Sequence, residues 1–318
     1  MFKLKNIFVI CFLILLVDTV QVFAELEISG FVDFLYQDEE EEYASFGMGA
    51  FEIDFAHELS PKACFEGAVV VEGDEVGLGQ TLVDFKLRDE KLGLQAGLLD
   101  IPFGIDYQVF AAPDRKLVSP PLVTDLMMAG GWGDVGINLY GSLSRMNYNL
   151  YVVNGMGEDG GNPVSQLNDN NNAKTIGGRI GISPKEDVEM GLSYTQGPYL
   201  DDNTRDDITR MGVAIQAVYK VVKLRAEYIA GKEEIPEAKA NKHNGYYAQL
   251  LGNVTKKLYS VARYGRWKPE GDDEVTRLTI ALGYDFIENA SIRIEFQTNK
   301  EEPEEDNNLA SAQVVMSF

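Results

Sequence analysis

Arginine recurs on one face of several extended segments in the second half of the chain. Successive side chains of a β-strand point to opposite faces, so residues two positions apart share a face. A row of guanidinium groups along a narrow lumen focuses the electric field and raises the local anion concentration. The candidate anion-contacting residues on these segments are Arg179, Arg210, Arg225, Arg263, Arg277 and Arg293.

Two further basic candidates, Arg115 and Lys116, lie in a long connection at about 104–131. This connection is apolar for a loop exposed to solvent, because it contains Ala111-Ala112-Pro113 and Pro120-Pro121-Leu122-Val123. Packing inside a lumen would explain that composition. We therefore expect 104–131 to be a pore-constriction loop that carries both basic residues.

Acidic residues interrupt the arginine pattern and leave several electrostatic hypotheses open. The inward acidic positions are Asp33, Glu52, Asp54, Glu66, Glu72, Asp84, Glu189, Glu227, Asp285 and Glu295. Arginines that face acids across the lumen would create a transverse electric field, and the pore would then pass small polar solutes with weak selectivity. Arg115 and Lys116 meeting Arg263 and Arg277 would instead favour anions, and a cation preference is a further alternative. A separate hypothesis is that some of the arginines form cross-strand ion pairs with neighbouring carboxylates and have a purely structural role.

The sequence contains no recognisable catalytic or metal-binding constellation. The histidines His57 and His243 have no serine or acid partner at a matching height, and no G-x-S-x-G elbow occurs. The acidic runs lack the D-x-[DN]-x-[DN]-G spacing of a calcium loop. We predict no enzymatic activity, no cofactor and no metal site.

Sixteen segments of alternating apolar and polar residues would position these side chains. Tight turns and longer loops alternate between the segments, which is typical of a bacterial transmembrane β-barrel. The expected strands are 25–37, 44–58, 62–73, 79–88, 91–103, 132–143, 145–154, 175–183, 187–196, 208–220, 221–231, 243–254, 257–267, 274–285, 289–299 and 308–318. The predicted fold is an all-β, antiparallel, up-and-down barrel of about 16 strands. Its third loop, the connection at about 104–131, is folded into the lumen.

Strand 208–220 illustrates the pattern. Met211 and Val213 fall on the face expected to contact lipid, whereas Arg210 and Gly212 fall on the other face. Outward aromatic residues lie near strand ends, where amphipathic rings prefer the membrane interfaces. A soluble β-sandwich would need two sheets with apolar inner faces, but one face of nearly every strand here is polar or glycine.

The N-terminus has the features of a secretory signal peptide at 1–24. Lys3 and Lys5 precede an apolar run at 7–17, and Val22-Phe23-Ala24 ends the segment with a small residue. The mature barrel would comprise 25–318, with Cys64 as its single cysteine, which excludes an intramolecular disulfide. We expect export to the bacterial outer membrane.

The chain is strongly acidic, with a formal net charge of -22. Nucleic acid is an unsuitable partner for such a polyanion. The acids cluster in the connections around 38–42, 201–207, 270–274 and 301–306. These clusters form either a solvated outer surface or, through divalent cations, a bridge to anionic lipopolysaccharide.

Strand number also bears on function. A barrel of 16–18 strands is too wide for its own side chains to fill and leaves an aqueous channel. Partial filling by the third loop would narrow that channel, and complete filling would give a plugged barrel with a structural or adhesin role. The sequence thus predicts a pore for small hydrophilic solutes, with the plugged barrel as the alternative.

Several motifs resemble those of the phosphate-selective porin O and P family. The resemblance covers Leu98-Leu99-Asp100-Ile101-Pro102-Phe103-Gly104, the segment 114–121, Gly131-Trp132-Gly133-Asp134-Val135-Gly136, and 245–267. It implies a sixteen-stranded outer-membrane porin that assembles as a homotrimer, with its third loop folded inward. The resemblance does not by itself decide which solutes pass. Because the basic residues match those of the family only in part, we expect a modest preference for anions such as phosphate, with a non-selective general porin as the alternative.

Overall fold

The computed structural model describes residues 26–40, 43–73, 75–128, 131–159, 162–164, 167–169, 171–198, 207–234, 239–271, 274–302 and 307–318. The predicted signal peptide at 1–24 lies outside these residues. So do 41–42, 199–206, 272–273 and 303–306, which hold much of the acidic loop clusters.

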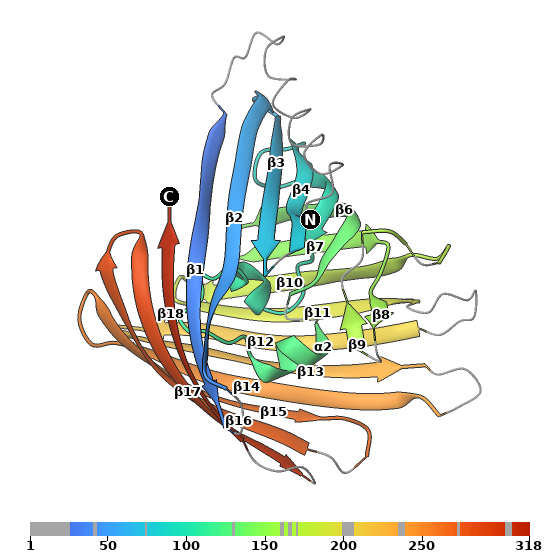
Figure 1. Cartoon of the computed structure of the whole chain (residues 1–318). Helices are drawn as coiled ribbons and strands as arrows, with labels where there is room; N and C mark the ends of the chain where they lie inside the picture. Colours follow the sequence, from blue (N-terminus) through green and yellow to red (C-terminus); the bar gives the residue numbers. More distant parts are fainter. Residues whose placement is uncertain are drawn as a thin grey trace.

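Sixteen strands of the described chain form a closed antiparallel barrel, as predicted. Each strand pairs with its neighbours along the chain, and β1 pairs with β18 to close the ring (Figure 1). The barrel strands are β1 (Glu27–Glu39), β2 (Ser45–Ser60), β3 (Ala63–Glu72), β4 (Glu75–Lys86), β5 (Gly93–Asp100), β6 (Gly133–Leu143), β7 (Met146–Val153), β10 (Thr175–Lys185), β11 (Val188–Pro198), β12 (Asp207–Tyr219), β13 (Val222–Glu233), β14 (Asn241–Asn253), β15 (Leu258–Lys268), β16 (Glu274–Ile287), β17 (Ala290–Glu302) and β18 (Asn307–Ser317).

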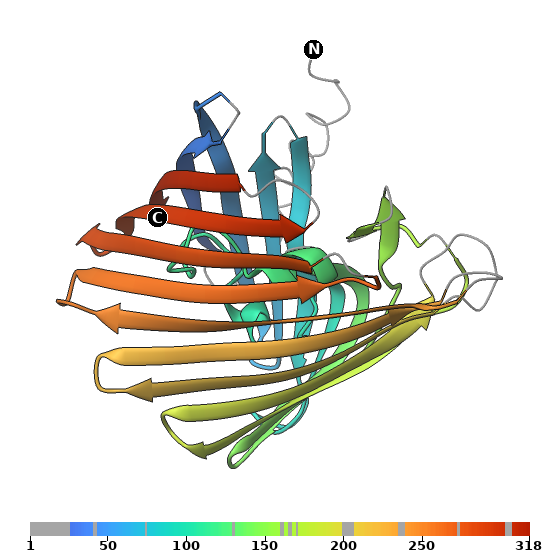
Figure 2. The ribbon, with the colours of Figure 1, turned by 90° about the horizontal axis from the view of Figure 1, so that it is seen from below.

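Burial alternates along the strands as the sequence pattern requires. On β12, the side chain of Met211 is 58% exposed on the outer face, whereas that of Arg210 is fully buried on the inner face. The pairing of β12 with β13 is continuous from Ile208 to Tyr219, so this alternation is kept in register across the two strands. Figure 2 shows the strands from the yellow to the red part of the chain lying side by side in this wall.

Many strand boundaries differ from the prediction by one to four residues, and two of these differences have a local cause. Strand β4 begins at Glu75, four residues earlier than expected, because Gly73 adopts a left-handed backbone with φ +60° and allows a tight connection from β3. Strand β5 ends at Asp100 rather than at 103. Pro102 follows, and proline has no N–H to donate to a strand ladder.

Smaller elements lie in the two longest connections. The third loop, between β5 and β6, contains the 3-10 helix η2 (Asp106–Val109) and the α-helix α2 (Leu122–Met127). A short hairpin of β8 (Gly157–Asp159) and β9 (Asn162–Val164) lies between β7 and β10. None of these elements was predicted from the sequence. In the described residues no helix is both long and apolar enough to span a membrane.

Candidate functional site

The third loop turns into the barrel at Gly104. This residue has φ +69°, and an added Cβ atom would lie 2.0 Å from Oε1 of Glu227. Its N–H donates to Oγ of Ser193 at 2.9 Å, and its carbonyl accepts from Nε of Arg179 at 2.6 Å. Two inward residues of the wall therefore fix the loop where it leaves β5.

An apolar core then packs the loop against the inner face of the wall. Phe103, Val123 and Met127 of the loop share one buried cluster with Ile229 of β13 and Tyr247 of β14. Helix α2 contacts β13, β14 and β15. The apolar composition of the loop is thus explained by packing inside the barrel.

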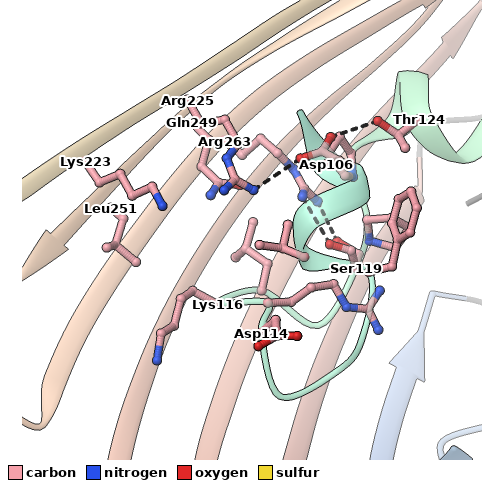
Figure 3. Close-up of a pocket in the computed structure, with 16 residues that line it drawn as sticks. Asp106, Asp114, Lys116, Ser119, Thr124, Lys223, Arg225, Gln249, Leu251 and Arg263 are labelled. Carbon is pink, nitrogen blue, oxygen red and sulfur yellow. Dashed lines mark hydrogen bonds and ion pairs between the residues drawn. The ribbon is translucent and has the colours of Figure 1, made fainter. Parts of the chain in front are cut away.

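Asp106 is the polar centre of this contact. Its Oδ2 accepts from Oγ1 of Thr124 at 2.9 Å, which ties η2 to α2. Its Oδ1 accepts from the hydroxyl of Tyr247 at 2.8 Å and from Nη1 of Arg225 at 3.3 Å. Figure 3 shows Arg225 directed from the wall toward this carboxylate.

Ser119 forms a second attachment between loop and wall. Nη1 of Arg263 donates to its carbonyl at 3.0 Å, and Nη2 donates to its hydroxyl at 2.7 Å (Figure 3). Oε2 of Glu295 accepts from the N–H of Val118 at 2.7 Å, and Oε1 accepts from that of Ser119 at 3.3 Å. A cation and an anion of the wall thus hold two adjacent residues of the loop.

Arg179 and Arg210 also have defined partners. Besides the Gly104 carbonyl, Arg179 contacts the carboxylate of Glu189 as an ion pair. Nε of Arg210 donates to the carbonyl of Met127 at 2.6 Å, and its Nη2 lies 3.2 Å from Glu233. Four predicted site residues, Arg179, Arg210, Arg225 and Arg263, are therefore all bonded to the third loop.

Arg277 and Arg293 interact within the wall. Nε of Arg277 donates to Asn299 at 2.6 Å, and Nη1 of Arg293 donates to Gln313 at 3.0 Å. Arg293 is 1% exposed, so little of its surface reaches the lumen.

The two basic residues of the third loop, Arg115 and Lys116, have different surroundings. Lys116 lies 3.5 Å from Asp285 and stacks over the ring of Tyr259 at 4.7 Å. Arg115 borders two hollows of the lumen, a smaller one beside β13–β15 and a larger one beside β1–β5. Burial lowers the pKa of the Arg115 guanidinium, and the nearby charge of Arg293 lowers it further.

The smaller hollow, of about 180 Å³, lies between the loop and strands β13–β15 and is predominantly basic. Figure 3 shows Lys116, Lys223, Arg225 and Arg263 around it. Arg115 also borders it, whereas Arg277 does not. The structure thus brings together three of the four residues in the predicted basic meeting point.

The larger hollow, of about 960 Å³, follows the inner faces of β1–β5 on the other side of the loop. Its lining includes Glu72 and Asp100 at the loop end of these strands and Glu27 and Ala56 toward the turn end. The remaining acidic lining residues are Asp33, Glu52, Asp54 and Glu66. The third loop therefore leaves open space along most of the height of this wall.

Sequence reasoning missed the attachment residues of this site. Glu295 was predicted to face inward, but no sequence pattern predicts that its carboxylate accepts hydrogen bonds from residues 118 and 119. Asp106 was hidden in a loop whose helices were not predicted. In the part of the chain that the structure describes, no group of three or more His, Cys, Asp or Glu side chains is arranged to hold a metal ion.

Comparison with known sequences finds a partial match to a curated protein. No family model matches the chain. An uncharacterised protein of Aquifex aeolicus strain VF5 is 29% identical over 136 residues, which cover 40% of this chain and 31% of that protein. The chain thus spans about a third of the length of the curated relative that it matches.

Comparison with solved structures identifies the fold. An anion-selective porin from Comamonas acidovorans aligns with a TM-score of 0.75 at 12% identity, covering 93% of this chain and 100% of that one. OmpF of Salmonella typhi gives 0.71 at 12% identity, with 93% and 98% covered. The trimer form of the outer membrane protein OmpT of Vibrio cholerae gives 0.69 at 10% identity, with 93% and 99% covered. The chain therefore has the porin fold.

Proposed function

We propose that this chain is an outer-membrane porin, a water-filled channel for passive diffusion of small hydrophilic solutes. The observation that carries this proposal is the hollow of about 960 Å³ that remains beside the third loop along β1–β5. Sixteen-stranded barrels are wide enough to enclose an aqueous channel. The loop occupies part of the cross-section and acts as the constriction.

Recording from the purified, folded protein in planar lipid bilayers tests the proposal. We expect stepwise conductance increments, because each inserted barrel adds one ion pathway. Folded protein that inserts without conducting would support the plugged barrel, whose function would then reside in its loops.

The sequence motifs favour one finer form of this function, a preference for anions such as phosphate. The basic hollow bounded by Lys116, Lys223 and Arg263 supports this preference, as does the similarity in fold to an anion-selective porin. The resemblance of the sequence motifs to the phosphate-selective porins O and P points the same way. Block of the conductance by added phosphate would support this form, and conductance without block would favour a general porin.

The proposal includes the cellular location and the oligomeric state of the channel. A cleaved signal peptide at 1–24 would export the chain to the outer membrane, where lipid and lipopolysaccharide would surround the barrel. The trimer form of the structurally similar OmpT of Vibrio cholerae supports a homotrimer. Sedimentation of the detergent-solubilised protein, corrected for bound detergent, measures this directly.

A further inference from the structure

We propose that the passage along β1–β5 favours cations over anions. This inference rests on the proposed channel function and specifies which solutes that channel admits. It reverses the polarity expected from the arginine-rich strands, because the third loop covers those strands and leaves an acidic wall facing the open space.

The first step of the argument is that the arginines are withdrawn from the passage. Arg179, Arg210, Arg225 and Arg263 are each at most 7% exposed and donate hydrogen bonds to the loop. None of these four lines the larger hollow. Their charges are balanced locally, since Glu189, Glu233 and Asp106 pair with the first three and Glu295 approaches the same loop segment as Arg263.

The second step concerns the exposed wall. Seven acidic residues line the larger hollow, namely Glu27, Asp33, Glu52, Asp54, Glu66, Glu72 and Asp100. Among the described residues, none of these seven forms an ion pair with Lys or Arg. Their charge is therefore left to be balanced by mobile ions.

The third step concerns the opposite side of the passage. The loop contributes Phe110, Ala111, Ala112, Val118 and Pro120, all without charge. Arg115 is the one basic residue among those that line this hollow. Lys116 is directed to Asp285 on the other side of the loop. Acidic side chains outnumber the single guanidinium in this lining, which gives the passage a negative potential that attracts cations and repels anions.

Reversal potentials in a KCl gradient test the inference. We expect the unmodified channel to have a K⁺ to Cl⁻ permeability ratio above one at low ionic strength, where charges are least screened. A unit charge some 8 Å from an ion in water changes the occupancy of that ion by about twofold. Glu27→Gln combined with Glu72→Gln, which removes two carboxylates from the lining of the hollow, should therefore lower the ratio by about twofold or more.

The matched control removes the same charge elsewhere. Glu186→Gln combined with Glu288→Gln neutralises two exposed carboxylates in the turns after β10 and β16, outside the lining of the hollow. We expect this control to leave the ratio nearly unchanged. Arg115→Gln provides a second, opposite test, because loss of the guanidinium should raise the ratio.

The outcomes separate this inference from the proposed function. A reversal potential of anion sign, a ratio of one, or an equal shift in the lumen and control variants would overturn the cation preference alone. Absence of conductance from a folded barrel would overturn the proposed channel and the preference with it.

Discussion

At the scale of single residues, the arginines of this barrel attach a loop. Removing one partner of a buried hydrogen bond leaves the other group unsatisfied, which costs about 1–3 kcal/mol and more where that group is charged. Arg263 and Glu295 meet this condition, because they are 3% and 1% exposed and hold adjacent residues of the loop. The loop position therefore depends on a few wall residues.

Arg263→Met should loosen the loop around Ser119. A hydrogen bond from a charged group contributes about 1.5–3 kcal/mol, so its loss should speed amide hydrogen exchange near residue 119 by about tenfold or more. Mass spectrometry of exchange in folded protein measures this. Arg266→Met is the control on the same strand, because Arg266 pairs with Glu274 at 2.5 Å and does not contact the loop. Equal exchange in both variants would contradict the attachment.

Gly104→Ala should displace the loop where it enters the lumen. A left-handed backbone costs a residue with a Cβ atom about 1–2 kcal/mol, and here the Cβ would also overlap Glu227. We expect larger and noisier single-channel conductance. Gly47→Ala is the control, because an added Cβ at Gly47 meets nothing within 4 Å. Unchanged conductance in Gly104→Ala would show that this turn does not set the constriction.

At the scale of elements, the third loop is an insert that packs against the strands that it covers. Helix α2 has six residues, too few to be stable alone in water, so its contacts with β14 and β15 must maintain it. Val123 is fully buried in this contact. Helix α2 therefore depends on the wall of the closed barrel for its stability.

Val123→Asp should detach α2 while leaving the barrel closed. A buried carboxylate without a partner costs several kcal/mol, which exceeds the contribution of one helical turn. Conductance should rise, and the folded species should persist on a gel run without heating. Asp125→Asn serves as the control, because Asp125 is exposed on the same helix. Loss of the folded species in Val123→Asp would mean that loop and barrel fold together.

At the scale of the whole molecule, closure depends on one seam. The N–H of Gly30 donates to the carbonyl of Phe318 at 3.1 Å, and the N–H of Phe318 donates back at 3.0 Å. A Cβ atom on Gly30 would lie 2.8 Å from the Phe318 ring and 2.2 Å from the carbonyl of Glu52. The last residue of the chain therefore packs on a position that has no room for a side chain.

Gly30→Leu should weaken this seam. We expect the folded species to convert to the unfolded one at a lower temperature on electrophoresis, because strands β1 and β18 would separate first. Gly77→Leu is the control, since nothing lies within 4 Å of its added Cβ. Equal transition temperatures would place the weakest point of the barrel elsewhere.

The sequence alone determined the sixteen strands and the alternation of apolar and polar faces along them. These properties are local, because period-two alternation is set by backbone geometry within each strand. It also indicated which loop is apolar enough to pack inside.

Only the tertiary structure decided which charges the lumen presents. Asp106 and Tyr247 are 141 positions apart in the chain, and Val118 and Glu295 are 177 apart. No local pattern predicts such pairs, because they depend on how the loop docks after the barrel has closed. The same docking buries four arginines and leaves the carboxylates of β1–β5 facing the open space, so the residues most prominent in the sequence are not those that line the larger passage.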